Sequence, residues 1–395
     1  MSLQIAAASA RRLPLEEMVE QTCQSIQSQL KQRPVDLAFV FFSIHFEDEG
    51  DKLAEAIQER LSPKHLLGCT TEGVIGPEHE FENEPALALW AAGLPEQAKV
   101  HEVVLDAAAL AALHETTNWR SLCSDISLEE QPSFLLLADP FTTPVNALLG
   151  GINQSFPGSP VHGGMASGAE APGQVGLISS QGAQREGLVG VALTGPVKVT
   201  SLVSQGCRPI GKPWVITKAD RNIMYQLGGQ RPLDVLMQTF EESPQDIQNM
   251  MQQGILLGRV IKEEQDRFGQ GDFLIRNLVD KDDQSGALAV NDMLRSGITV
   301  QFHVRDARTA HEDLEQMALL LKDSPPKGAL LFSCNGRGQR LFDKKDHDVG
   351  VLHQVWGDCP VAGMFCAGEF GPISGRNFIH GFTASVACFH ELVDD

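Results

Sequence analysis

One sequence pattern occurs three times along the chain, and it constrains the fold more than any other feature. The pattern is G-x4-G-x3-P, found as GCTTEGVIGP (68–77), GGMASGAEAP (163–172) and GMFCAGEFGP (363–372). With 37 glycines and 21 prolines in 395 residues, independent placement would give roughly 0.2 matches. Three matches therefore indicate a structural unit that was copied within the chain.

The residues around each motif repeat as well. An apolar run precedes each motif, as LAFVFFS (37–43), FLLLAD (134–139) and ALLFSC (329–334). Between this run and the motif lies a helical segment, at 51–61, 144–153 and 347–356. A second apolar run follows each motif, beginning at residues 86, 187 and 378. Strand-length runs separated by helix-length segments predict β-α-β units with an added strand.

The spacing of the motifs predicts a fourth copy without the glycine–proline signature. The first glycines stand at 68, 163 and 363, so the second interval is about twice the first. A unit near Gly258, within ILLGRVI (255–261), would complete the series. Two units per half predict a duplicated α/β protein with two similar halves, in which stacked β layers are flanked by helices. The Gly/Pro-bearing stretch 205–213 is the expected seam, which gives domains 1–207 and 208–395.

Composition and charge exclude several classes of protein. The formal net charge of −20 argues against a broad surface for nucleic acid or anionic membrane. The apolar runs are too short to cross a bilayer, and the first arginines follow the apolar N-terminal stretch, unlike a secretory signal. The cysteines are scattered without a C-x-x-C pair. We therefore expect a cytoplasmic protein with reduced thiols, no membrane span and no nucleic-acid partner.

Several segments resemble one family of sensory proteins. FLIRNLVD (273–280), VQFHVRDA (300–307), GALLFSCNGRG (328–338), PVAGMFCAGEFGP (360–372) and NFIHGFTAS (377–385) resemble the FIST C domain, and LLGCTTEGVIG (66–76) resembles the FIST N domain. The resemblance covers nearly the whole chain and is closest to the stand-alone form of the family. It implies a sensory protein that binds a small ligand, with amino acids or their derivatives as the proposed class. Such a protein would signal by conformational change or by docking to a protein partner.

The three glycine-rich loops supply the first candidate ligand-binding residues. Loops at strand ends are where α/β proteins commonly bind ligands. A carboxylate at such a turn could receive an ammonium group. The alternative is that the glycines only permit tight turns and that the carboxylates are solvated. The candidates from these loops are Thr71, Glu72, Gly73, Ser167, Gly168, Gly368 and Glu369.

The segment FSCNGRG supplies a second set, together with a cysteine on the next strand. Cys334 and Cys366 end two strands of one unit, so both are expected to face one cavity. Asn335 offers a donor and an acceptor, and Arg337 could clamp a carboxylate. Two alternatives stay open: the cysteines are small buried apolar residues, or one of them serves a thiol-dependent hydrolase or transferase.

The third set lies on two apolar strands, at Arg276, Asn277 and Arg305. An arginine within such a strand needs an anion, which Asp306 or a ligand carboxylate could provide. We find no H-E-x-x-H zinc motif, no Walker loop and no G-x-S-x-G elbow. No catalytic residue, metal site or cofactor is therefore predicted, and a non-enzymatic sensor is favoured over the enzyme.

Overall fold

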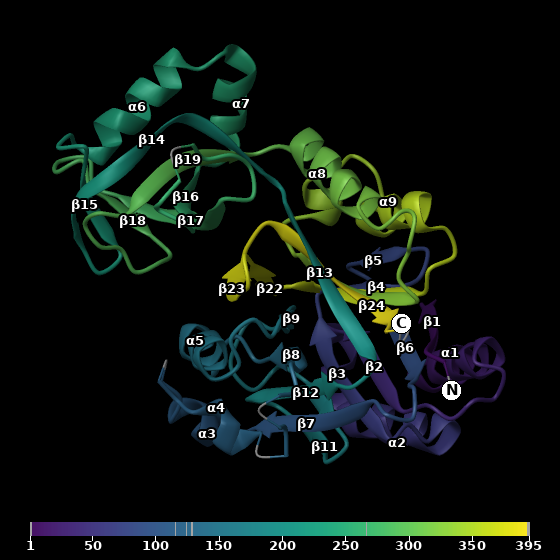
Figure 1. Ribbon diagram of the computed structural model, residues 1–395. Helices are drawn as coiled ribbons and strands as arrows, with labels where there is room; N and C mark the ends of the chain where they lie inside the picture. The colour runs from purple at the N-terminus through teal and green to yellow at the C-terminus, as the bar shows by residue number, and fades with distance from the viewer. Residues whose placement is uncertain (1, 115, 124, 128, 266, 393–395) are drawn as a thin grey trace. The chain divides into compact units, whose positions relative to one another are not determined.

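The computed structural model describes residues 2–114, 116–123, 125–127, 129–265 and 267–392. The chain forms two compact units (Figure 1). Unit 1 comprises Met1–Val203, Leu314–Ile379 and Thr383–Asp395, and unit 2 comprises Ser204–Asp313 and His380–Phe382. Among the described residues, every helix is too short or too polar to reach across a membrane.

Unit 1 consists of three modules with the same order of elements, which confirms the repeat that the motifs predict. Module 1 contains β1 (Gln4–Arg11), α1 (Leu15–Gln29), β2 (Leu37–Ser43), η1 (Ile44–Glu49), α2 (Gly50–Leu61), β3 (His65–Thr71), β4 (Gly73–Ile75), β5 (Glu80–Glu82) and β6 (Ala86–Gly93). Module 2 contains β7 (Lys99–Leu105), α3 (Ala107–Ala111), α4 (Trp119–Leu122), β8 (Ser133–Ala138), α5 (Val145–Ser155), β9 (Val161–Met165), β10 (Leu177–Ser179), β11 (Gly182–Gln184) and β12 (Leu188–Thr194). Module 3 contains β13 (Val197–Gln205), α8 (Ala307–Leu319), β20 (Gly328–Cys334), η2 (Gly338–Arg340), α9 (His347–Trp356), β21 (Val361–Cys366), β22 (Glu369–Ile373), β23 (Arg376–His380) and β24 (Thr383–Glu391).

The modules exchange hairpins in a cycle. The three sheets have the orders β1-β6-β2-β3-β10-β11, β7-β12-β8-β9-β22-β23 and β13-β24-β20-β21-β4-β5. Each sheet thus holds four strands of one module and a hairpin of another. Module 1 extends the sheet of module 3, module 2 extends that of module 1, and module 3 extends that of module 2. In modules 1 and 3 the hairpin begins at Gly73 and directly after Gly368, so the motif marks the point where the chain leaves its own sheet. In module 2 a loop separates Gly168 from the hairpin, which begins at Leu177.

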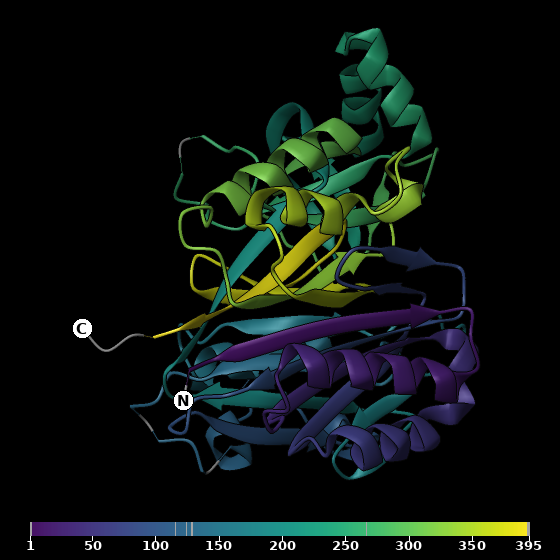
Figure 2. The same cartoon turned by 90° about the vertical axis from the view of Figure 1, so that its right-hand side faces the viewer.

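The inner faces of the three sheets share one core, and helices cover the outer faces. Phe41 of β2 meets Phe332 of β20 with ring centroids 6.2 Å apart. Trp90 of β6 meets Phe389 of β24 at 4.7 Å. Figure 2 shows α1 and α2 on the outer side of the sheet that contains β1. Helices α3, α4 and α5 pack on the second sheet, and α8 and α9 on the third. The expected α/β class with helix-flanked β layers is confirmed.

The first glycine of each motif allows two strands to approach closely. A Cβ atom at Gly68, Gly163 or Gly363 would lie 2.4, 1.9 or 1.8 Å from a carbonyl oxygen of the neighbouring parallel strand, at Val40, Leu136 and Leu331 respectively. Such contacts are far inside van der Waals distance, so any side chain would force the strands apart. The repeat of this glycine therefore follows from packing.

Unit 2 is a closed barrel with two helices, and it corrects the expectation of a fourth copy. It contains β14 (Cys207–Asp220), β15 (Ile223–Leu227), α6 (Pro232–Glu242), α7 (Gln245–Gln253), β16 (Leu256–Val260), β17 (Phe273–Lys281), β18 (Leu288–Val290) and β19 (Thr299–Arg305). The barrel order is β14-β15-β18-β17-β16-β19. The strand near Gly258 is β16, which pairs antiparallel with both β17 and β19, whereas the first two core strands of every module are parallel.

The expectation of a copy near Gly258 is therefore wrong, because the long interval between motifs reflects an insertion. The barrel follows β13 and precedes α8, at the position where module 1 passes directly from β1 to α1. Three modules and one barrel thus stand in place of the two similar halves that an even series implied. The division at 207/208 stays a prediction.

Candidate functional site

Most of the predicted ligand-binding residues lie in unit 1, at strand ends and in the loops that follow them. Arg276, Asn277 and Arg305 lie in unit 2. Residues of unit 1 belong to two groups: the junction of the three modules, and the loop after β20 with the start of β22.

The junction is held by hydroxyl groups from two modules that converge on a third. Thr71 of module 1 and Ser167 of module 2 both donate to the carbonyl oxygen of Phe365 in module 3, at 2.8 and 2.5 Å. The backbone N–H of Glu72 donates to Ser167 Oγ at 2.9 Å. Thr71 and Ser167 are buried, and these hydrogen bonds join the modules.

Glu72 and Asn335 line a small hollow beside this junction. The Glu72 carboxylate forms an ion pair with Arg340, whose Nη1 donates to the carbonyl oxygen of Asn335 at 3.1 Å. Gly73 and Phe365 also line the hollow. Its volume is about 10 Å³, which is room for about one water molecule. As it stands, the hollow is too small for a metabolite, and Arg340 closes it.

A buried ion pair organises the loop after β20. Arg337 donates from Nε and Nη2 to the two carboxylate oxygens of Asp348, each at 2.8 Å. Ser333 also donates to this carboxylate at 2.8 Å, and His347 Nδ1 lies 2.8 Å from it. Burial alone would raise the pKa of Asp348, but the guanidinium of Arg337 holds it well below its usual range. Asp348 was not among the predicted residues, although its place in the first turn of a helix is typical of a carboxylate.

Three polar atoms around this loop have no hydrogen-bond partner among the described residues, although all three are shielded from solvent. They are Asn335 Oδ1, Arg337 Nη1 and Glu369 Oε1. The backbone brings them together, because Asn335 N donates to the carbonyl oxygen of Cys366 at 2.9 Å and Cys334 pairs with Cys366 across β20 and β21. Buried polar groups are nearly always hydrogen-bonded, so three exceptions at one place call for an explanation. We call this set the Cys334 cluster: Cys334, Asn335, Arg337, Cys366 and Glu369.

Burial favours the neutral form of Glu369. Its side chain is fully buried at the start of β22, and Thr383 Oγ1 donates to its Oε2 at 2.8 Å. Burial raises the pKa of Glu369 to about 8, although the Thr383 hydrogen bonds and the charge of Arg337 act in the opposite direction. A protonated carboxyl can both donate and accept, which widens the set of groups that it can bind.

The two cysteines of the cluster differ in their surroundings. Cys366 is fully buried, and burial raises the pKa of its thiol well above the usual value. Cys334 is partly exposed, and its sulfur accepts from Gly336 N at 3.4 Å. The hypothesis of a nucleophilic thiol therefore depends on Cys334, since a thiol that stays protonated is a poor nucleophile.

Comparison with models of protein families shows to which family the chain belongs. The model of the FIST N domain matches residues 36–230, and that of the FIST C domain matches residues 232–372. The chain belongs to the FIST family. FIST domains are associated with sensing and signal transduction.

The FIST domains do not coincide with the compact units. The FIST N match begins just before β2, so it includes module 1 without β1 and α1, then module 2, and it extends to β15. The FIST C match begins at α6. The junction between the two matches thus falls within the barrel. The Cys334 cluster lies wholly within the FIST C match, whereas Thr71, Glu72 and Ser167 lie within the FIST N match.

Relatives of this FIST protein occur in mycobacteria. An uncharacterized protein of Mycobacterium tuberculosis is 40% identical over 356 residues, which cover 89% of this chain and 91% of the relative. An uncharacterized protein of Mycobacterium bovis is 37% identical over 363 residues, which cover 91% of each chain.

In the barrel of this FIST protein, the predicted arginines have protein partners. Arg276 Nε lies 3.3 Å from the carboxylate of Asp292, which Arg259 also approaches at 3.2 Å. Asp292, and not Asp306, is therefore the anion for Arg276. Asp306 instead accepts from the N–H of Arg308 at 3.0 Å, near the start of α8.

The other two residues of this third set differ from Arg276 in their surroundings. The guanidinium of Arg305 lies over the ring of Phe382, with its carbon 5.6 Å from the ring centroid. Asn277 is exposed. The anion partner of Arg276 was missed because Asp292 lies on a loop that follows a different strand, β18, and sequence spacing does not show this proximity.

Proposed function

We propose that this FIST protein is a sensor that binds a small polar ligand at the Cys334 cluster. The observation that carries the proposal is the presence of three solvent-shielded polar atoms without partners, at Asn335, Arg337 and Glu369. Leaving a buried polar atom without a hydrogen bond costs about 1–3 kcal/mol. A ligand that supplies the missing partners recovers this free energy on binding.

The types of these atoms suggest which ligand to test first. Arg337 Nη1 is a donor, suited to a carboxylate oxygen, and the oxygens of Asn335 and Glu369 accept from an ammonium or amide group. Amino acids and their derivatives carry both groups. Because Arg337 is already neutralised by Asp348, the cluster favours a ligand whose own charges balance.

Signalling requires that the ligand bind one conformation better than another. Arg337 links β20 to α9, and Glu369 begins the hairpin that module 3 contributes to the sheet of module 2. A ligand that contacts both would change the balance between packing arrangements of these elements. We propose that a protein partner in the cytoplasm detects this change.

The test combines a ligand screen with one matched pair of variants. The full chain is heated with each amino acid and with small organic acids, and a ligand at about one hundred times its Kd is expected to stabilise the protein by about 2.7 kcal/mol. Asn335→Asp should abolish the increase in melting temperature, because it places a second acidic group beside Glu369. Asn249→Asp, which adds the same charge at an exposed position of α7, should retain it.

Two outcomes would contradict a sensor that binds its ligand at the Cys334 cluster. In the first, no compound raises the melting temperature of the unmodified protein. In the second, Asn335→Asp responds to a compound as the unmodified protein does. The second outcome would place the ligand elsewhere in the chain.

The alternative function is a thiol-dependent hydrolase or transferase that uses Cys334. Its partial exposure and the N–H of Gly336 on its sulfur favour this candidate over Cys366. Peptide mapping after brief treatment with iodoacetamide separates the two functions. A sensor predicts that Cys334 is alkylated no faster than a free thiol and that Cys366 is protected until unfolding. Alkylation of Cys334 much faster than that of a free thiol would favour the enzyme.

A further inference from the structure

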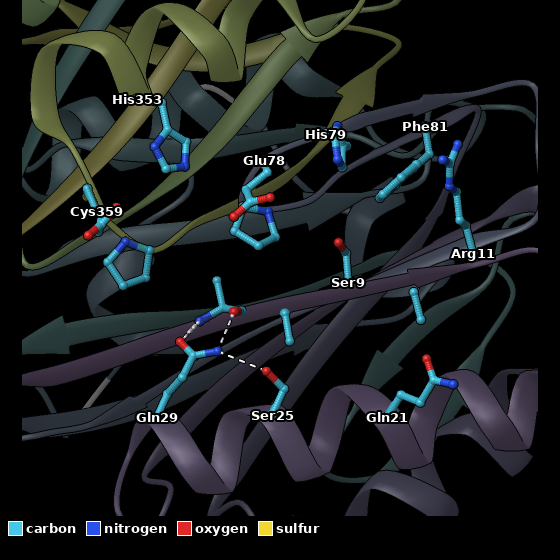
Figure 3. Close-up of a pocket in the computed structure, with 16 residues that line it drawn as sticks. Ser9, Arg11, Gln21, Ser25, Gln29, Glu78, His79, Phe81, His353 and Cys359 are labelled. Carbon is cyan, nitrogen blue, oxygen red and sulfur yellow. Dashed lines mark hydrogen bonds between the residues drawn. The ribbon is translucent and has the colours of Figure 1, made fainter.

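A second hollow in unit 1 is lined mostly by residues of module 1. Its volume is about 570 Å³, which is within the range of ligand sites. Figure 3 shows β1 running through it, with side chains of α1 on one side and Glu78, His79 and His353 on the other. We call it the β1 groove. Its walls are residues 7–11, Gln21, Ser25, Gln29, residues 77–79, Phe81, His353 and residues 358–360.

The groove contains a free edge of a β-sheet. β1 is the outermost strand of its sheet and pairs with β6 alone. Arg12 N donates to the carbonyl oxygen of Pro85, just beyond the ladder, so the even-numbered residues of β1 exchange hydrogen bonds with β6. The N–H and C=O groups of Ala7, Ser9 and Arg11 therefore point to the opposite edge. In the part of the chain that the structure describes, no strand pairs with that edge.

Gln29 occupies this edge in the way that a peptide group would. Its Nε2 donates to the carbonyl oxygen of Ala7 at 2.9 Å, and its Oε1 accepts from Ala7 N at 3.4 Å (Figure 3). A side-chain amide has the same donor and acceptor as a backbone peptide group. The pair of bonds at Ala7 thus shows that the edge accepts an amide from the groove side.

The side chains around the edge leave the backbone accessible. Residues 7–10 of β1 are alanine or serine, so their side chains do not cover the neighbouring groups. Gly76 lies against Ser9, where an added Cβ would be 2.3 Å from Ser9 Oγ. The edge is therefore narrow, and an extended chain fits it better than a helix.

The unpaired charges of the groove are acidic. Glu78 and Asp358 are exposed, and among the described residues neither forms an ion pair. Arg11 is paired with Glu84, and His79 with Asp346. The net charge of the whole chain is also negative, at −20. A partner with lysine or arginine side chains would complement these carboxylates.

We propose that the β1 groove binds an extended, basic segment of a partner protein, which pairs with β1 as an added strand. The segment displaces the Gln29 amide from Ala7 and continues along Ser9 and Arg11. Backbone hydrogen bonds supply sequence-independent affinity, as in other cases of strand addition, while Glu78 and Asp358 select basic side chains. This inference goes beyond small-ligand binding, since it assigns a surface at which a partner protein in signalling would bind.

The test uses three fluorescent peptides whose binding to the full chain is measured by anisotropy. The first is a capped octapeptide of alternating lysine and valine, and the second replaces lysine with glutamate. The third is the lysine peptide with every amide N-methylated, which keeps the charge and removes the backbone donors. Binding of the first peptide alone is expected. Equal binding of the first and third peptides would overturn the proposal, since it would show charge attraction without strand pairing, as would failure of the first peptide to bind.

Variants of the groove test its two components. Gln29→Ala removes the competing amide and should raise the affinity for the lysine peptide about fivefold. Gln24→Ala, an exposed glutamine on the same helix, should leave the affinity unchanged. Glu78→Lys combined with Asp358→Lys should lower it by about tenfold or more. Unchanged affinity in Gln29→Ala or in the double lysine variant would overturn the proposed geometry.

Discussion

Arg337 and Asp348 form a bidentate ion pair in which the two side chains are 0% and 1% exposed. The pair joins the loop after β20 to the first turn of α9 and fixes the guanidinium plane. Both bonds to Asp348 use Nε and Nη2, which leaves Nη1 for another group. The same contact therefore stabilises the fold and positions the donor proposed for the ligand.

Breaking this pair is expected to destabilise unit 1 strongly. Arg337→Met leaves the carboxylate of Asp348 buried without its counter-ion, which should cost about 3–5 kcal/mol of unfolding free energy. The measurement is urea denaturation of the full chain. Arg337→Met with Asp348→Leu should recover part of this loss, because no buried charge remains. Arg308→Met, which removes an exposed arginine paired with Glu312, should cost less than about 1 kcal/mol.

The hydrogen bonds between modules make a second prediction. Ser167→Ala removes the donor to Phe365 O and the acceptor for Glu72 N. We expect a loss of about 1–3 kcal/mol, because Glu72 N loses its acceptor and Phe365 O keeps only the hydrogen bond from Thr71. Urea denaturation would show it, with the exposed Ser324→Ala as the control. If the two variants were equally stable, the junction at Ser167 would not hold the modules together.

The sequence could predict the repeat because one of its causes is local. The first glycine of each motif is required by the neighbouring strand, so the packing demand leaves a mark at a fixed position in each copy. The run at 255–261 was wrongly interpreted as a strand of a fourth module for a related reason. It is apolar, strand-length and preceded by helical sequence, and these properties are common to a module strand and to barrel strand β16. Only the pairing partners of β16 distinguish them.

The site could be predicted less completely, because its contacts are long-range. Cys334 and Cys366 were expected at neighbouring strand ends, and their register pairing agrees with that expectation. Asp348 completes the ion pair from a helix, and Thr383 holds Glu369 from another strand. Neither contact follows from residue type or spacing. The missing partners of Asn335, Arg337 and Glu369 are visible only after every hydrogen bond in the loop has been placed.

The three modules differ at the carboxyl ends of β2, β8 and β20. Ser43, Asp139 and Cys334 lie there, beside the ends of β3, β9 and β21. Ser43 Oγ accepts from Ala86 N, and Asp139 accepts from the N–H groups of Phe141 and Thr142. Modules 1 and 2 thus use this position for backbone capping. In module 3 the Cys334 sulfur also accepts from a backbone group, Gly336 N. Its neighbours Asn335, Arg337 and Glu369 carry the polar atoms without partners among the described residues, which is why we place the ligand in this module.

The third prediction compares alanine substitutions at two glycines, Gly363 of the motif and Gly350 of α9, which should change the free energy of unfolding in opposite directions. Gly363→Ala should cost about 3 kcal/mol or more, because its Cβ would lie 1.8 Å from the carbonyl oxygen of Leu331 in a strand that cannot move freely. Gly350 lies inside α9, and a Cβ there would meet no described atom within 4 Å. Gly350→Ala should therefore stabilise the protein by about 0.5–1 kcal/mol. Thermal unfolding of both variants would check the signs, and similar shifts in the same direction would contradict the packing argument.

Glu369 gives a prediction about pH. Its pKa is raised to about 8 by burial in the folded chain, whereas an unfolded chain has a value of about 4.3. Between these values the unfolded chain has lost the proton and the folded chain keeps it, so stability falls as pH rises, by up to about 1.4 kcal/mol per pH unit for this group. Glu369→Gln keeps a neutral group of the same shape and should gain stability relative to the unmodified protein as pH increases from about 5 to 8. Urea denaturation across this range would measure the difference. The exposed Glu17→Gln should show a constant difference, and a constant difference for Glu369→Gln as well would mean that the Glu369 carboxyl is ionised in the folded chain.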